Sequence, residues 1–347
     1  MNKKLLLLTA GRIVCALYSL TIITASCFLH SRYADGETIF VAEDCPMLCV
    51  QSAAALPDSG DAYHDFTPEQ PDRDESGESA AACDALADNP ALVAIDLHNS
   101  DAWALSNETA YQPALQTLFQ SPLPQTGYVR TATSADNAPL VLILHTHGTE
   151  CYADDMDDPT SYSFRTDDTA RNVVAVGEVY AQTLLDRGIS ALHCTVMHDR
   201  ESYITAYSRA AETIRAYLKE YPSIRYVLDI HRDALERSDG SILRPVVAGE
   251  AGNAAQVMLV VGTDELGGNH PLWQQNLALA LRLQGRLEES CPGITRAVNL
   301  RSATFNQQYT SGSLLIETGS TGNTLAEAKK SAEIVANALA DLITGAS

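Results

Sequence analysis

From about residue 137 to the C-terminus, short apolar runs alternate with longer segments in which apolar residues recur at helical spacing. An apolar run of about four to eight residues is typical of a buried strand, whereas apolar residues that recur every third or fourth position predict an amphipathic helix. The pattern predicts strands at residues 140–145, 189–194, 224–231, 256–262, 297–300 and 314–317. It predicts helices at residues 172–187, 203–220, 272–288 and 324–343. This alternation predicts an α/β fold, with one catalytic domain at residues 136–347 and a mixed, mostly parallel sheet flanked by helices on both faces.

Two of these helices carry capping signals at their ends. Gly188 follows the helix at residues 172–187 and suits the left-handed conformation at a helix C-terminus. Thr324 and Glu327 have the spacing of a capping box, which predicts that the last helix begins there.

The first thirty residues have the pattern of a membrane anchor. Lys3 and Lys4 precede an apolar run at residues 13–29, which residues 5–11 extend. The combined run is long enough to cross a bilayer, and the basic flank predicts a cytoplasmic N-terminus with the catalytic domain outside. We expect an uncleaved single-pass anchor at residues 1–30, with a cleaved signal peptide as the alternative.

Residues 31–135 read as an acidic tether between anchor and domain. Up to about residue 90 they are rich in Ala, Asp, Ser, Pro and Glu and show little periodicity, which predicts disorder. Residues 91–120 contain enough apolar side chains for a short helical segment that packs on the domain. The net charge of −21 argues against nucleic-acid binding by the bulk of the protein. The 8 cysteines follow no metal-ligand spacing, and their pairing stays open.

Three of the predicted strands end in residues that can bind a metal or move a proton. His147 follows the strand at 140–145, His231 ends the strand at 224–231, and Glu317 ends the strand at 314–317. Side chains at strand ends face the crevice where open α/β folds hold their ligands. Two histidines joined by one carboxylate form a three-ligand zinc site that leaves a position open for water. The sequence therefore predicts a zinc hydrolase.

The carboxylate ligand has three candidates. Glu150 lies in the loop after His147, and Asp167 and Asp168 lie just before the first helix of the domain. His145 precedes His147 by two positions, so on an extended strand both side chains point the same way. We expect one of the two to bind the metal and the other to hold substrate or support the ligand.

Glu317 is the candidate general base and acid. A carboxylate beside zinc can take a proton from water and return it to the leaving amine. Arg232 and Asp233 directly follow His231 and are candidates for orienting the ligand or holding substrate. No HExxH, GxSxG or P-loop motif is present, which removes the usual support for zincin, α/β-hydrolase and NTPase activities.

The stretches at residues 142–152, 227–234 and 315–324 contain His-Thr-His-Gly-Thr-Glu, Leu-Asp-Ile-His-Arg-Asp and Ile-Glu-Thr-Gly-Ser-Thr-Gly-Asn, respectively. In these stretches the chain resembles the stage II sporulation protein P family of endospore-forming bacteria. Further matching stretches lie at residues 171–177, 198–209 and 300–307, so that the resemblance covers roughly residues 138–345 in order.

The resemblance implies a membrane-anchored peptidoglycan hydrolase that degrades the cell wall during engulfment of the forespore. The family is similar to zinc-dependent N-acetylmuramoyl-L-alanine amidases, and its members are described as cutting that amide and also peptide cross-links. By motif, His147 and His231 match the histidine ligands and Glu317 the catalytic glutamate. The amidases' middle ligand is a Glu before the first helix, and this chain has only Asp167 and Asp168 there, which favours Glu150.

Further expectations follow from the same resemblance. Arg301 and Asn306 lie in the matching stretch at 300–307 and are expected to bind substrate or support the ligands. Stage II sporulation proteins D and M are the expected partners. Two alternatives remain: an inactive wall-binding or scaffold protein of the engulfment machinery, and a metal peptidase that cuts only cross-links.

Overall fold

The computed structural model of the chain describes residues 30–34, 37–41, 92–98, 104–118, 120, 122–124, 138–153, 164–249 and 252–345. Residues 1–29 of the expected membrane anchor and residues 42–91 of the expected tether lie outside these ranges. Within the described ranges, no helix is long and apolar enough to cross a membrane.

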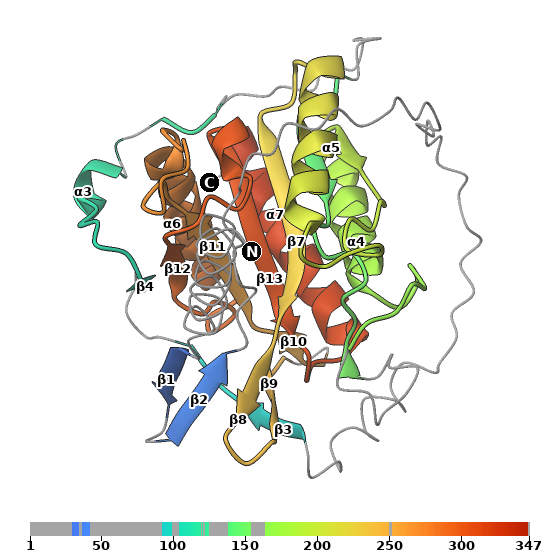
Figure 1. Cartoon of the computed structure of the whole chain (residues 1–347), viewed down its shortest axis with the longest axis vertical. Helices are drawn as coiled ribbons and strands as arrows, with labels where there is room; N and C mark the ends of the chain where they lie inside the picture. Colours follow the sequence, from blue (N-terminus) through green and yellow to red (C-terminus); the bar gives the residue numbers. More distant parts are fainter. Residues whose placement is uncertain are drawn as a thin grey trace, which may run out of the picture.

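A seven-stranded sheet forms the centre of the fold, in the order β4-β12-β11-β13-β7-β5-β6 (Figure 1). Its strands are β4 (Leu105–Asn107), β5 (Val141–Leu144), β6 (Ala191–His193), β7 (Tyr226–Asp233), β11 (Val257–Gly262), β12 (Val298–Arg301) and β13 (Gly312–Ser320). Neighbouring strands are parallel except for β11 and β13, which pair antiparallel. The predicted mixed, mostly parallel sheet is confirmed.

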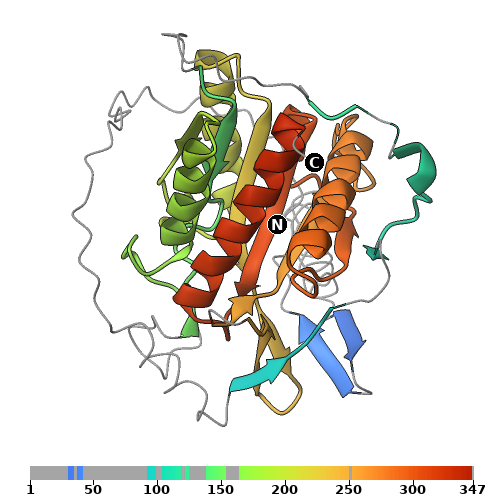
Figure 2. The same ribbon diagram turned by 180° about the vertical axis from the view of Figure 1, so that it is seen from behind.

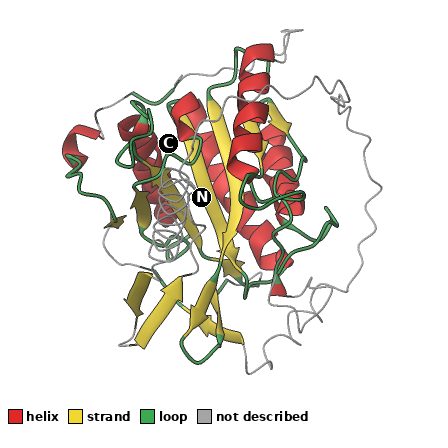
Figure 3. Cartoon of the chain, viewed as in Figure 1, coloured by secondary structure: helices red, strands yellow, loops and turns green. Residues whose placement is uncertain are grey.

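Helices cover both faces of this sheet, as the sequence predicts (Figure 3). One face carries α4 (Val173–Asp186), α6 (Trp273–Ser290) and α7 (Leu325–Thr344), which Figure 2 shows side by side. The other face carries α5 (Ala206–Glu220). The alternation along β7 explains the two layers: Leu228 and Ile230 join the core with α4, α6 and α7, whereas Val227 packs with Ile214 of α5.

The α5 face has a second, smaller apolar cluster away from α5. Met258 and Val260 of β11 and Leu315 of β13 form it, and Phe305 packs against it. These side chains line a pocket. A ligand can therefore reach the strands of the sheet at this place.

A small second sheet adjoins the large one. It runs in the order β1-β2-β8-β9-β10, and β3 also pairs with β9. Its strands are β1 (His30–Ala34), β2 (Glu37–Val41), β3 (Leu92–Ile95), β8 (Leu235–Arg237), β9 (Ile242–Val247) and β10 (Ala254–Ala255). Strands β1 and β2 come from the part of the chain that the sequence assigns to the end of the anchor and the start of the tether. Because β2 pairs with β8, this strand depends on an edge supplied by a distant segment, which local composition does not reveal.

The segment at residues 104–118 packs along the edge of the large sheet. Its strand β4 pairs with β12, and its short helix α3 (Leu115–Leu118) buries Leu118 in the main core. Between them, Tyr111 stacks on Trp273 with ring centroids 5.1 Å apart and donates its hydroxyl to Asp264 at 2.9 Å. In the segment where the sequence predicts a short helix, the structure has the four-residue helix α3, and the strand before it was not predicted.

The predicted helix ends are also confirmed. Asn172 caps α4 by accepting a hydrogen bond from the Val174 N–H at 3.0 Å, and Gly188 just beyond the helix has a φ of 78°. Thr324 and Glu327 form both hydrogen bonds of the capping box that begins α7. A short 3₁₀ helix, η2 (Gln307–Tyr309), links β12 to β13.

Candidate active site

The site forms where the loop after β5 meets the ends of β7 and β13. Asp229 of β7 holds this loop, because its carboxylate accepts the Thr146 N–H at 2.8 Å and the Thr146 hydroxyl at 2.6 Å. Gly148 allows the loop to approach the next one closely, since a Cβ there would lie 2.9 Å from the Met197 Cα. These contacts fix the backbone between His147 and Glu150.

His231 lies between two carboxylates. Its Nε2 is 3.0 Å from Asp229 Oδ1, and its Nδ1 is 3.6 Å from Glu150 Oε2. Burial alone lowers the pKa of His231, but the charges and hydrogen bonds of these two carboxylates raise it well above its ordinary value. Burial likewise raises the pKa of Asp229, yet the His231 charge and hydrogen bond lower it to about 2.

His147 lies beside His231, with ring centroids 5.4 Å apart and the rings nearly perpendicular. Its other face stacks on Tyr203 at a centroid distance of 4.0 Å, and Asp199 Oδ2 is 3.9 Å from its Nδ1. Burial lowers the pKa of His147 to about 3. The imidazole is therefore neutral at physiological pH, which is the form that binds metal ions.

Arg232 fixes Glu150 from the opposite side. Its backbone N–H donates to Glu150 Oε2 at 3.3 Å, and its Nη1 is 3.6 Å from Glu150 Oε1. The guanidinium also donates to the carbonyls of Cys151 at 3.1 Å and Phe164 at 3.0 Å. Burial raises the pKa of Glu150, but the Arg232 charge and the His231 hydrogen bond bring it below its ordinary value. The contacts of Arg232 make it a residue that positions Glu150 and the loop around it.

Glu317 lies directly beside His231 across the sheet. The two residues are register partners of the parallel strands β13 and β7. The sequence predicts strands that end at these residues, but β7 continues to Asp233 and β13 to Ser320. The register shifts between Glu317 and Ser320, and Gly319 has a φ of 80° in this bulge.

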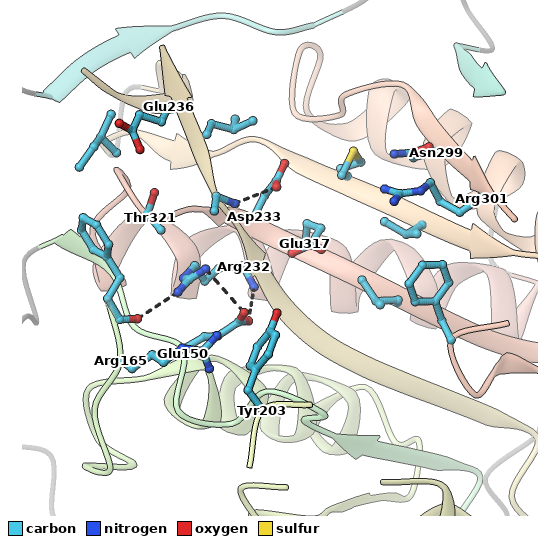
Figure 4. A pocket seen from close by; sticks show the side chains of 18 of the residues that line it. Glu150, Arg165, Tyr203, Arg232, Asp233, Glu236, Asn299, Arg301, Glu317 and Thr321 are labelled. Atoms are coloured by element: carbon cyan, nitrogen blue, oxygen red, sulfur yellow. Dashed lines mark hydrogen bonds and ion pairs between the residues drawn. The ribbon is translucent and has the colours of Figure 1, made fainter. Parts of the chain in front are cut away.

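A cavity of about 350 Å³ opens in front of these residues (Figure 4). Glu150, Arg232 and Glu317 line it, whereas His147 and His231 are each only 1% exposed. Tyr203 forms part of the wall in front of His147. The cavity therefore gives a ligand access to the two glutamates, with both imidazoles directly behind them.

The structure places some of the predicted residues elsewhere. His145 does not point the same way as His147, because β5 ends at Leu144 and the chain turns there. Its Nε2 is 2.9 Å from His193 Nε2 and its Nδ1 donates to the Ile230 carbonyl at 3.0 Å, so it supports β7 from behind. Burial lowers the pKa of His145 to about 3.

The two aspartates before α4 are not brought to the site. Asp167 is paired with Arg200 at 3.1 Å with both side chains more than half exposed, and Asp168 accepts the Ala170 N–H at 3.0 Å. Both aspartates are exposed polar residues of the loop before α4. Of the three candidate carboxylates, only Glu150 lies beside the histidines.

Three further candidates have different positions. Asp233 lines the cavity but is held by an ion pair with Arg296 at 2.7 Å. Asn306 does not line the cavity, because its amide donates to the Tyr207 carbonyl at 2.8 Å. Arg301 does line it, at the end formed by β12.

Two buried carboxylates beside the histidines are not among the residues predicted from the sequence. Asp229 lies two positions before His231 on the same strand face, so the period of a strand could have identified it. Asp199 accepts the Thr149 hydroxyl at 2.5 Å and pairs with Arg165 at 2.7 Å. No local pattern in its loop distinguishes Asp199 from a solvated acid.

The donor types of the site fit zinc. Donors to one zinc ion lie about 2.0–2.2 Å from it, and hence roughly 3–3.5 Å from one another. The separation of 3.6 Å between His231 Nδ1 and Glu150 Oε2 is close to this value. The other ring nitrogen of His231 faces the carboxylate of Asp229, and metal-binding histidines are commonly supported by a carboxylate in this way. In the part of the chain that the structure describes, however, no group of three or more His, Cys, Asp or Glu is arranged so that it could hold a metal ion.

Comparison with known proteins identifies relatives of the chain. The family model described as Stage II sporulation protein P matches residues 50–340. Stage II sporulation protein P of Bacillus subtilis (strain 168) is 25% identical over 214 residues, which cover 58% of this chain and 51% of that protein. The chain thus spans about half the length of this curated relative.

Two solved amidase structures are also similar. An N-acetylmuramoyl-L-alanine amidase from Clostridium difficile 630 has 15% sequence identity and a TM-score of 0.34, over 58% of this chain and 95% of that one. The apo form of an amidase from Mycobacterium abscessus has 12% identity and a TM-score of 0.34, over 60% of this chain and 100% of that one.

Proposed function

This chain belongs to the stage II sporulation protein P family, and we propose that it is a zinc-dependent peptidoglycan hydrolase that acts in forespore engulfment. The proposed reaction is hydrolysis of the amide between N-acetylmuramic acid and L-alanine. Cleavage of peptide cross-links is a second activity of the same site. The observation that carries the proposal is the adjacency of Glu317 and His231 across two parallel strands, with Glu150 Oε2 3.6 Å from His231 Nδ1.

His147, His231 and Glu150 are the proposed ligands of the zinc ion. Bound zinc would polarise the amide carbonyl and lower the pKa of water at the site. Asp229 would hold the His231 ring through Nε2 and thereby keep Nδ1 directed at the metal. Arg232 would hold Glu150 in place through its two contacts with that carboxylate.

Glu317 is the proposed proton carrier. It lines the cavity beside His231 and takes a proton from the attacking water, then donates it to the nitrogen of the departing amine. The two-step proton transfer is needed because an amine anion is too poor a leaving group to depart unprotonated. The apolar side chains of Met258 and Leu315 exclude water from one wall of the same cavity.

A membrane tether is also part of the proposal. The basic and apolar sequence at residues 1–30 supports a single-pass anchor with a cytoplasmic N-terminus and an extracytoplasmic hydrolase. Association with stage II sporulation proteins D and M is proposed from the family relationship alone.

Digestion of purified sacculi by the full chain tests the function. We expect release of peptides with a new N-terminal alanine, identified by mass, and loss of the products after chelation with restoration by zinc. Products that carry only broken cross-links would identify a peptidase instead. Binding to sacculi without any cleavage, in a protein loaded with zinc, would identify an inactive wall-binding scaffold.

A further inference from the structure

The cavity beside Glu317 extends across the sheet to β12. Glu317 is paired with Met258 of β11, and Arg301 of β12 is paired with Gly262, four positions farther along β11. The strands of Glu317 and Arg301 are two strand spacings apart, roughly 10 Å, and the offset along β11 adds roughly 13 Å in the perpendicular direction. Both side chains line the same cavity and shorten this gap. On the order of 10–13 Å remains, which an extended peptide covers in three or four residues.

The far end of the cavity has the chemistry of a peptide-binding site. Arg301 and Asn299 lie two positions apart on β12 and therefore share one face, and Figure 4 shows them together at the end of the cavity away from Asp233. Asn299 is only 1% exposed, and its Oδ1 has no hydrogen-bond partner among the described residues. A buried amide oxygen without a partner is costly, and a ligand N–H would remove that cost.

A carboxylate already lies against Arg301. Glu108 Oε2 is 3.2 Å from Arg301 Nε, and both side chains remain partly exposed, at 14% and 16%. Glu108 is held there because it directly follows β4 and its N–H donates to the Leu300 carbonyl at 3.0 Å. The Arg301 guanidinium therefore already pairs with a carboxylate beside the cavity.

We propose that Arg301 and Asn299 form a subsite for the peptide stem of the substrate. Arg301 binds a free carboxylate carried three or four residues from the bond that is cut, and Asn299 Oδ1 accepts a peptide N–H beside it. Glu108 occupies Arg301 in the free protein and competes with the substrate carboxylate. The inference rests on the proposed function, because it names the part of the substrate that the same cavity holds.

Paired synthetic substrates test this subsite. Two soluble N-acetylmuramoyl tetrapeptides, both with amidated C-termini, would differ only in that their third and fourth residues carry side-chain carboxylates in one and carboxamides in the other. With the full-length, zinc-loaded protein we expect kcat/KM to be about tenfold higher for the acidic peptide. Arg301→Gln should reduce this ratio to within about twofold of unity, mainly through KM for the acidic peptide.

Two other variants separate recognition from structure. Glu108→Gln should lower KM for the acidic peptide a few-fold because it removes the competing charge, whereas a purely structural Glu108–Arg301 pair predicts only lower stability. Arg215→Gln is the matched control, since it removes an exposed arginine of α5 that does not line the cavity. It should leave the ratio unchanged.

Each outcome supports or overturns the proposed subsite. Equal rates on both peptides in the wild-type protein, or an equal loss on both in Arg301→Gln, would overturn the subsite while leaving the hydrolase intact. If the wild-type protein cuts neither peptide nor sacculi, the proposed function fails, and calorimetric binding of the two peptides decides the subsite separately. Tighter binding of the acidic peptide that is lost in Arg301→Gln supports it, and equal binding overturns it.

Discussion

Asp229 Oδ1 lies 3.0 Å from His231 Nε2, and the same carboxylate accepts both the N–H and the hydroxyl of Thr146. Asp229 thereby connects His231, the proposed zinc ligand on β7, to the loop after β5 that contains the proposed ligands His147 and Glu150. The carboxylate sets the orientation of the ring and of the loop at once.

Asp229→Asn should therefore weaken zinc binding without unfolding the protein. An amide supports the imidazole less well than a carboxylate, and loss of such a partner costs about 10- to 100-fold in metal affinity. Competition with a fluorescent chelator measures the change. Asp239→Asn is the control, because Asp239 is an exposed turn residue whose carboxylate accepts hydrogen bonds from Ser241. Equal zinc affinity in the wild type and Asp229→Asn would remove Asp229 from the site.

The ligand assignment has its own test. His147→Ala and His231→Ala should each lose the single zinc ion, since two of three protein ligands do not hold it in a tetrahedral site. Metal analysis by mass spectrometry after gel filtration gives the stoichiometry. Asp167→Ala should keep its zinc, because the structure places Asp167 at the surface beside Arg200. Near-stoichiometric zinc in both histidine variants would contradict the assignment.

A buried histidine outside the site predicts a pH effect on stability. His270 is fully buried, and burial lowers its pKa from the ordinary value near 6.5 to about 4. Between these two values the unfolded chain binds a proton that the folded protein excludes, so the free energy of unfolding falls as the pH decreases from about 6.5 to 4. Relative to His270→Gln, the wild-type protein should lose on the order of 1–3 kcal/mol over this interval in urea titrations. An identical pH profile for both proteins would contradict the shift.

The close packing of α4 against the sheet predicts the effect of one methyl group. A Cβ at Gly177 would lie 2.5 Å from His145 Nε2 and 2.6 Å from His193 Nε2. Gly177→Ala should destabilise the protein by about 1–3 kcal/mol, although alanine is the better helix former by roughly 1 kcal/mol. Gln182→Ala on the exposed side of α4 is the control and should change stability by less than about 0.5 kcal/mol. Equal or greater stability of Gly177→Ala in urea unfolding would show that the two rings can shift freely.

The sequence predicts the central layers of the fold well because periodicity reports burial. Strands β5 and β11 are nearly continuous apolar runs, β7 and β13 each contain a shorter apolar run, and the helices between them have one apolar face. The edge strands are different. Strand β4 has the sequence Leu-Ser-Asn and is defined by hydrogen bonds to β12 rather than by its own residues. Such pairing depends on the partner, so a single-sequence pattern cannot supply it.

The sequence likewise predicts some residues of the candidate site and not others. His147, His231, Glu150 and Glu317 lie together because their strands adjoin, which the alternation of strands and helices allows one to expect. The predicted direction of the His145 side chain was wrong because the strand ends one residue earlier than the apolar pattern suggests. Asp199 reaches His147 only through tertiary contacts between two loops, for which the sequence carries no periodic signal. The roles of these residues in zinc binding and catalysis stay predictions.

Glu317 is proposed to move the proton and not to hold the metal ion. Glu317→Gln keeps the shape of the side chain but cannot accept a proton, a function worth about 10²–10⁴-fold in rate. Glu333→Gln is the matched control, because Glu333 is an exposed glutamate of α7, on the opposite face of the sheet.

The most direct measurement is the rate of sacculus hydrolysis by the Glu317→Gln protein, with its zinc content determined in the same preparation. We expect a folded protein with one zinc ion, normal binding to sacculi and hydrolysis reduced by at least about a hundredfold. Near-wild-type hydrolysis would show that Glu317 does not carry the proton, and loss of the zinc ion would make Glu317 a ligand rather than the base.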